Sequence, residues 1–324
     1  MKRSILPVFI PHLGCPHNCV FCDQKQIAAR QAPTPAQAAA LVEAGLERAR
    51  RPQIAFYGGS FTAIGREAMM AYLEAVQPFL RDGSCAGIRI STRPDAVDDG
   101  VLDLLARYGV DTIELGAQSM SDEVLREAGR GHRAADTAEA ARRVKAHGFE
   151  LILQMMVGLP GSTAEDERQT ARQLAALGPD GVRIYPTCVL AHTPLYDLYR
   201  RGLYRPLTVD GAVEICADLL DIFEERSVPV IRLGLNPTEE LSGGAVKAGA
   251  YHPALGELVF SERFYRRMLP LLPRGVPCTV MVPEKMLSIA IGQKKRNLER
   301  FRQAGCIISI RGEKDCLRPE IRPL

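Results

Sequence analysis

The sequence predicts an α/β protein, a partial (β/α)6-type TIM barrel followed by a small α/β unit at the C-terminal end. Short apolar, β-rich runs alternate with helical segments over residues 1–235, which is the pattern of parallel β-α units. Six or seven such units within about 230 residues fit a complete or partial barrel, and an open doubly wound sheet is the alternative. From residue 274 the pattern becomes strand, helical stretch and strand.

The elements of the barrel are recognised by apolar runs and by helix caps. Thr34 followed by Pro35 predicts a helix start, and Gly109 predicts a helix end. Residues 236–273 are rich in Gly and Pro and are predicted as a loop-rich cap between a 1–235 core and a 274–324 unit. The predicted strands are 5–10, 53–57, 87–92, 111–115, 150–156, 181–186 and 228–233.

Composition narrows the class of protein. The chain has 324 residues, 46% hydrophobic and 24% charged, as in ordinary globular enzymes. No apolar run reaches the length of a membrane span, and the short apolar start, broken by Pro7 and Pro11, does not read as an export signal. We therefore expect a cytoplasmic protein without membrane contact, whose nine cysteines stay reduced.

Three of these cysteines form a dense cluster directly after the first predicted strand. Cys15, Cys19 and Cys22 have the spacing C-x3-C-x2-C. A strand's carboxyl end is the active face of a β/α barrel. Three thiolates can hold a [4Fe–4S] cube and leave one iron open, whereas structural zinc needs a fourth ligand, for which His12 or His17 is available.

This motif resembles the signature of the radical SAM (S-adenosylmethionine) superfamily, in which an aromatic residue precedes the last cysteine, as Phe21 does here. The resemblance implies that Cys15, Cys19 and Cys22 ligate a [4Fe–4S] cluster and that SAM chelates the open iron. It also implies reductive cleavage of SAM to a 5′-deoxyadenosyl radical, with an electron from a low-potential donor such as flavodoxin or ferredoxin.

The same resemblance implies SAM contacts at the ends of later strands. Two glycines in YGGSFT favour close backbone approach to a ligand, although a plain turn is the alternative. The arginine of GRGHR suits a carboxylate, with a surface arginine as the alternative. The implied SAM-binding residues are Phe21, Gly58, Gly59, Ser60, Glu114, Gln118, Arg130, Gln154 and Tyr185.

A narrower resemblance covers about residues 5–265. STRPD (91–95), ELGAQS (114–119), RGH (130–132), IYPT (184–187) and AYHPALGE (250–257) resemble the radical SAM portion of the Elongator catalytic subunit and its short bacterial relatives. It implies an RNA substrate, with tRNA favoured, but we expect no acetyl-CoA domain. Tyr251 and His252 are candidate catalytic residues, and a structural role for His252 is the alternative.

The C-terminal unit is basic. Residues 274–324 hold eleven Lys/Arg and five Asp/Glu, a net charge of +6, which leaves −3 on the rest of a chain of net charge +3. Residues 280–312 resemble a KH module, whose G-x-x-G loop clamps nucleic-acid backbone. The implied RNA-binding residues are Gly292, Gln293, Lys294, Lys295 and Arg296, with Lys295 in place of the second glycine.

The sequence therefore predicts a radical SAM enzyme that modifies RNA, with tRNA as the candidate substrate. The first alternative is a radical SAM enzyme acting on a small metabolite, with a purely structural KH-like segment. The second is a zinc-containing RNA-binding protein.

Overall fold

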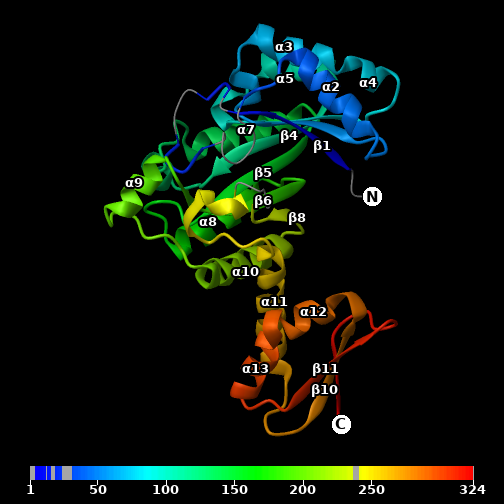
Figure 1. The fold of residues 1–324 in the computed structure, drawn as a ribbon, viewed down its shortest axis with the longest axis vertical. Helices are drawn as coiled ribbons and strands as arrows, with labels where there is room; N and C mark the ends of the chain where they lie inside the picture. Colours follow the sequence, from blue (N-terminus) through cyan, green and yellow to red (C-terminus); the bar gives the residue numbers. More distant parts are fainter. Residues whose placement is uncertain (1–3, 12, 16–18, 24–30, 236–240, 324) are drawn as a thin grey trace.

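The computed structural model describes the chain except residues 1–3, 12, 16–18, 24–30, 236–240 and 324 (Figure 1). Its larger part is a curled, parallel sheet of seven strands in the order β1-β2-β3-β4-β5-β6-β8, which forms a half-barrel. The partial barrel is confirmed, and every predicted strand overlaps a strand of this sheet. The strands are β1 (Ile5–Ile10), β2 (Gln53–Gly58), β3 (Gly87–Thr92), β4 (Val110–Gln118), β5 (Glu150–Val157), β6 (Gly181–Pro186) and β8 (Val230–Leu233).

Helices follow the strands because parallel neighbours need crossover connections. They cover the outer face of the curled sheet in Figure 1. The predicted cap at Thr34 is present as a capping box, in which Thr34 and Gln37 exchange hydrogen bonds. The helices of the barrel are α2 (Pro35–Leu46), α3 (Arg66–Ala75), α4 (Gln77–Arg81), α5 (Asp99–Arg107), α6 (Asp122–Glu127), α7 (Ala134–Ala146), α8 (Ala164–Ala176), α9 (Pro194–Arg200) and α10 (Val209–Glu225).

The central strands β2 to β6 are largely buried on both faces, so their sequences are mostly apolar. Ile54, Phe56, Ile88, Ile90 and Ile113 are all buried in one core. Because the strands run parallel, the segments that follow them gather along one edge, which we call the carboxyl edge.

Ordered structure occupies much of the range predicted as a loop-rich cap. β9 (Val246–Gly249) pairs antiparallel with β7 (Cys188–Leu190), and α11 (Leu255–Met268) follows. Leu255 and Val259, near the start of α11, pack in the barrel core, whereas Phe264 and Met268 belong to a second core. One helix therefore joins the two parts of the molecule, as Figure 1 shows.

The C-terminal unit is a mixed sheet with two helices. Its strand order is β11-β10-β12; β10 pairs parallel with β11 and antiparallel with β12. The predicted helical stretch is two helices separated at Gly292, where φ is 76°, as expected for the loop of a KH-like unit. The elements are β10 (Cys278–Pro283), α12 (Leu287–Ile291), α13 (Arg296–Gln303), β11 (Ile308–Glu313) and β12 (Glu320–Pro323).

Short single-turn segments complete the description. They are η1 (Phe61–Ala63), η2 (Pro94–Ala96), η3 (Leu241–Ala245), η4 (Leu269–Leu271), η5 (Glu284–Met286) and η6 (Gln293–Lys295). Over the described residues, none of the helices has both the length and the apolar character that a membrane crossing requires.

Candidate functional site

The three clustered cysteines lie in the loop after β1, at the carboxyl edge. Cys19 is buried, and Cys15 and Cys22 are half-buried. The backbone N–H of Val20 donates to the carbonyl of Ala128 at 3.0 Å, and the N–H of Leu195 donates to the carbonyl of Val20 at 2.8 Å. The loop is thus held between the end of α6 and the start of α9.

Arg130 connects this loop to β4. Its Nη1 donates to Sγ of Cys19 at 3.3 Å, and its Nη2 donates to the carbonyl oxygen of Gly116 at 2.7 Å. Nε is buried and has no hydrogen-bond acceptor among the described residues. A buried cationic donor with a free N–H suits a bound carboxylate, because it needs a partner and arginine matches carboxylate geometry.

The thiols are close enough to affect one another. Burial, then the neighbouring Cys19 and Cys15, raises the pKa of Cys22 to about 12. Burial and then Cys19 raise the pKa of Cys15 as well, and Arg130 and Arg93 oppose that rise. Thiols with such pKa values are protonated at neutral pH, so a metal that binds them releases protons.

The two glycines after β2 seat the cysteine loop. A Cβ on Gly59 would lie 2.0 Å from the carbonyl oxygen of Leu13, and a Cβ on Gly14 would lie 2.1 Å from that of Ser60. The N–H of Ser60 donates to Leu13 O at 2.9 Å. A Cβ on Gly58 would lie 3.1 Å from the backbone of Ile10. The close backbone approach predicted here is therefore an approach to the protein's own loop.

A buried arginine that sequence reasoning did not single out lies beside this contact. The Arg93 guanidinium pairs with Asp95 through bonds of 2.9 and 2.5 Å, and the backbone N–H of Arg93 donates to Ser60 Oγ at 3.2 Å. Hydrogen bonding to Asp95 raises the pKa of Arg93. The available signal was a charged residue placed directly after a buried strand, in STRPD.

The end of β4 is irregular and strained. Gln118 has φ 66°, and the β4–β5 register shifts between Gly116 and Gln118. Gln118 and Gln154 exchange amide hydrogen bonds of 2.7 and 3.1 Å. Left-handed conformations of residues other than glycine concentrate at functional sites. The structure therefore brings these two predicted residues together at the carboxyl edge.

His132, also not singled out from the sequence, supports the same irregularity. It is buried, and its Nε2 lies 3.2 Å from the carbonyl oxygen of Ala117. Burial, with the nearby charge of Arg130, lowers the pKa of His132 to about 4. The imidazole is therefore neutral at physiological pH.

Glu114 and Tyr185 lie in a polar network inside the barrel. Glu114 Oε2 is 3.2 Å from Arg183 Nε, an ion pair whose angle does not meet hydrogen-bond geometry. Arg183 also donates to the hydroxyls of Tyr57 at 2.7 Å and Tyr185 at 3.3 Å. Burial raises the pKa of Glu114 and is opposed by Arg183. Arg183 and Tyr57 were not predicted from the sequence.

An apolar wall stands beside these polar groups. Phe21 and Tyr185 both pack against a small buried cluster made by Val124, Ala128, Met156 and Leu159. Two residues predicted from distant motifs therefore meet on one apolar surface.

The candidate catalytic pair lies after β9. Tyr251 packs against Cys188 and Leu190 of β7. Nδ1 of His252 accepts a hydrogen bond from the N–H of Ala254 at 3.1 Å, just before α11. This contact is the local role that the sequence left open for His252.

The residues predicted to bind RNA lie in the other part of the molecule. A Cβ on Gly292 would lie 2.9 Å from Oγ of Ser261, so this glycine permits packing against α11. Gln293, Lys294 and Lys295 are exposed. Arg296 forms an ion pair with Asp210 of α10 at 2.6 Å.

The sequence matches the profiles of two known protein families. The sequence profile of the radical SAM superfamily matches residues 9–174, and that of the radical SAM C-terminal domain matches residues 179–264. The chain belongs to the radical SAM superfamily. The first match covers the cysteine loop and strands β2 to β5, including Arg130.

Curated relatives of this radical SAM protein include tRNA uridine(34) acetyltransferases and Elongator complex protein 3. A tRNA uridine(34) acetyltransferase of Methanocaldococcus infernus is 29% identical over 179 residues, which are 54% of this chain and 33% of that protein. Elongator complex protein 3 of Mus musculus is 31% identical over 181 residues, 55% of this chain and 32% of that protein. The chain thus spans about a third of the length of these relatives. An uncharacterized protein of Methanocaldococcus jannaschii is 29% identical over 231 residues, 64% of this chain and 69% of that protein.

Solved structures share the fold. The archaeal Elp3 of Methanocaldococcus infernus, with an N-terminal deletion, aligns with a TM-score of 0.63 at 23% identity, covering 83% of this chain and 63% of that chain. The similarity to the Elongator radical SAM portion is thereby confirmed for sequence and fold.

Radical SAM proteins use a [4Fe–4S] cluster and SAM, and the residues of the carboxyl edge fit both. In a cube each thiolate binds its own iron, so the sulfurs need not converge on one point. Over the described residues, no three His, Cys, Asp or Glu side chains gather around a single ion position. His12 and His17, considered as zinc ligands, lie outside the described residues. The free Nε–H of Arg130 fits the carboxylate of SAM.

Proposed function

We propose that the protein is a radical SAM enzyme that modifies RNA, with tRNA as its substrate. The observation that carries the proposal is the position of Arg130, half-buried between Cys19 and Gly116 with its buried Nε–H left free. A chain that only bound RNA through a structural zinc would have no use for a cation with a buried, unpaired Nε–H beside its thiols, because an unpaired buried donor costs stability.

Cys15, Cys19 and Cys22 would hold the cluster, and the fourth iron would accept SAM. When bound, the cluster supplies the electron that cleaves SAM reductively to a 5′-deoxyadenosyl radical; a flavodoxin- or ferredoxin-type donor is the proposed source of that electron. The other roles belong to the chain's own side chains.

Those side chains bind and orient SAM and exclude water. Arg130 holds the carboxylate, and the amides of Gln118 and Gln154 offer donors and acceptors at the same edge. Gly58, Gly59 and Ser60 fix the loop that carries the thiols. Phe21 and Tyr185 form an apolar wall. A dry, rigid site protects a radical from solvent and holds it near the substrate.

The RNA substrate is supported by two independent features. Relatives that match over 54% and 55% of this chain are named for tRNA uridine(34) acetylation and for Elongator. The C-terminal unit is basic, with eleven Lys/Arg against five Asp/Glu from residue 274 onward, and a basic unit suits phosphates. Acetyl transfer is not part of the proposal. Work on tRNA would place the protein in the cytoplasm.

The test is anaerobic reconstitution with iron, sulfide, SAM and dithionite, with bulk tRNA present or absent, followed by mass spectrometry of 5′-deoxyadenosine and of digested nucleosides. We expect about four irons per chain and a nucleoside mass change that depends on SAM. Cys19→Ala should lose the iron, whereas Cys85→Ala, a buried cysteine outside the loop, should keep it. Zinc without iron would refute the assignment. Deoxyadenosine formed only with a metabolite extract would favour the small-molecule alternative.

A further inference from the structure

Only part of the positive charge of the C-terminal unit is available to a polyanion, because carboxylates neutralise the rest. Four of its arginines are engaged in ion pairs: Arg296 with Asp210, Arg300 with Glu262, Arg302 with Glu299, and Arg322 with Glu313. Lys294 and Lys295 are exposed, and within the described part of the chain neither has a carboxylate within 4.0 Å. Composition alone therefore overstates the charge that a polyanion can reach, and these two adjacent lysines retain theirs.

The turn that carries these lysines has an unusual backbone. Lys294 and Lys295 both have left-handed conformations, with φ 51° and 62°. Such conformations cost free energy for residues other than glycine and persist where the surroundings enforce them. Here the N–H of Lys295 donates to Gly292 O at 3.0 Å, and Asn297 anchors the start of α13 by donating to Ser261 O at 2.9 Å. The turn is thus fixed with two cations outward.

The turn lies against the barrel. The ion pair between Arg296 and Asp210, 2.6 Å long, joins it to the first turn of α10 and neutralises that carboxylate. Five residues before Asp210 is Arg205, and five residues span at most about 18 Å. The lysine turn is therefore joined to the N-terminal end of α10, which the segment with Arg205 directly precedes, although about ninety residues separate the turn and the segment in sequence.

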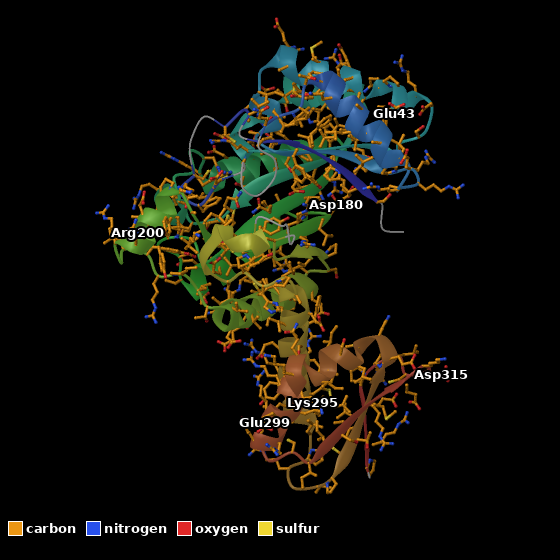
Figure 2. All side chains as sticks on the ribbon, in the orientation of Figure 1. Glu43, Asp180, Arg200, Lys295, Glu299 and Asp315 are labelled. Carbon is orange, nitrogen blue, oxygen red and sulfur yellow. The ribbon has the colours of Figure 1, made fainter. Side chains whose placement is uncertain are left out.

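That segment is also basic. Arg200, Arg201 and Arg205 are exposed, and none has a carboxylate within 4.0 Å in the part of the chain that the structure describes. α9 carries one acidic residue, Asp197, in its first turn, and Arg200 lies in its last turn. Figure 2 labels Arg200 at the outer end of the barrel part and Lys295 in the C-terminal unit. We call these five cations, Arg200, Arg201, Arg205, Lys294 and Lys295, the bridging basic surface.

The arginine end of this surface reaches the carboxyl edge. Leu203, Tyr204 and Arg205 line a pocket of about 420 Å³ together with residues 158–162, which follow β5. The hydroxyl of Tyr204 donates to Gly158 O at 2.6 Å, which ties this segment to the end of the strand. A polymer held on the bridging basic surface would therefore pass next to the edge that carries the cysteine loop.

We propose that the bridging basic surface binds the phosphate backbone of the RNA substrate and delivers the RNA from the C-terminal unit to the carboxyl edge. The inference rests on the proposed function. Cations that contact phosphates position a backbone rather than read bases, so binding should depend on salt.

The experiment measures the dissociation constant of bulk tRNA for the full chain, by filter binding at several salt concentrations. Lys294→Gln/Lys295→Gln and Arg201→Gln/Arg205→Gln each remove two cations. Each pair should weaken binding about tenfold and lower the slope of log affinity against log salt by about 1 to 2. The control is Lys314→Gln/Arg318→Gln, two exposed cations that flank Asp315, which Figure 2 draws across the unit from Lys295; binding should change less than twofold.

The other outcomes of this experiment contradict either the bridging basic surface or the proposed function. If wild type binds tRNA but the arginine pair binds equally well, the bridging basic surface is wrong while the proposed function stands. If the control loses as much as the test variants, only net charge matters and the surface is wrong. If wild type does not bind tRNA, the proposed function fails with it. Unchanged tRNA binding with slower reduction by an acidic flavodoxin would make this surface a site for the electron donor and overturn the inference.

Discussion

Arg130 reaches across 111 residues of sequence to donate a hydrogen bond to the thiol of Cys19 at 3.3 Å. The same guanidinium holds Gly116 O at 2.7 Å, so one side chain fixes the cysteine loop relative to the end of β4. A single ammonium cannot reproduce this planar fork.

Arg130→Lys should therefore weaken SAM binding while the thiols still load iron. The loss of a charged, buried hydrogen-bond pair corresponds to about 10- to 100-fold in affinity. Equilibrium dialysis of SAM against the reconstituted protein, with iron analysis, measures both effects. Arg126→Lys, an exposed arginine of α6, is the matched control. Unchanged SAM affinity in Arg130→Lys would contradict the role proposed for this residue.

Gly59→Ala should disturb the cysteine loop. The new Cβ would lie 2.0 Å from the carbonyl oxygen of Leu13, which is backbone and cannot rotate away. We expect a loss of about 1 to 3 kcal/mol in the free energy of unfolding and reduced iron loading. Gly256→Ala on α11, whose Cβ would meet nothing closer than 3.9 Å, is the control and should be neutral or slightly stabilising. Full iron loading and unchanged stability in Gly59→Ala would show that the loop can shift freely.

The buried ion pair of Glu114 and Arg183 should tolerate joint replacement better than loss of one partner. Their side chains are 7% and 14% exposed, so either charge alone would be poorly solvated. Arg183→Met is expected to cost about 3 to 5 kcal/mol in urea unfolding, whereas Glu114→Gln with Arg183→Met should recover much of it. Equal losses in the single and double variants would mean that the arginine stabilises the barrel through Tyr57 and Tyr185 instead.

Glu167 should make stability depend on pH. Burial raises the pKa of this glutamate from 4.5 to about 7, although Ser162 Oγ and Gly158 N donate to it. Between about pH 4.5 and 7 the unfolded chain releases the proton first. The wild type should therefore lose stability relative to Glu167→Gln as pH rises through this window, by up to roughly 3 kcal/mol. Urea unfolding of both proteins at pH 4.5, 6 and 8 measures the difference; a constant difference would contradict the raised pKa.

His252→Asn should distinguish a local role from a catalytic one. The asparagine oxygen can accept the hydrogen bond that Nδ1 now takes from Ala254 N–H. We expect His252→Asn to keep stability and turnover within a few-fold, and His252→Ala to lose about 1 kcal/mol. If both variants retain the cluster and SAM yet form no modified nucleoside, the catalytic role predicted from the sequence is supported.

Much of the fold could be predicted because it depends on local patterns. Buried parallel strands need apolar runs, and Thr34, Pro35 and Gly109 have conformational preferences that their neighbours do not override. The turn at Gly292 was expected from the resemblance to a KH module, whose loop separates two helices. The close packing of this glycine against Ser261, a residue about thirty positions earlier, was not expected, because sequence periodicity carries no information about such a contact.

The candidate site likewise has residues that could be predicted from the sequence and residues that could not. The spacing of Cys15, Cys19 and Cys22, with Phe21 before the last cysteine, was sufficient for the resemblance that implies the cofactor, because three thiols on one short loop are a local property. Arg183 and His132 were missed, because their partners Glu114 and Ala117 come from other elements and meet them only in the folded sheet. Arg93 was missed although its side-chain partner Asp95 is only two residues away.

The sequence by itself thus determined the β-α order, the spacing of the clustered cysteines and the basic character of the C-terminal unit, all of which follow from residue types at short spacing. The tertiary structure alone decided which cations stay available. Arg296 and Arg300 are paired by carboxylates of α10 and α11, whereas Lys294 and Lys295 are not. The physical reason is that charge neutralisation depends on distances of a few ångströms between elements far apart in the chain, and folding sets those distances.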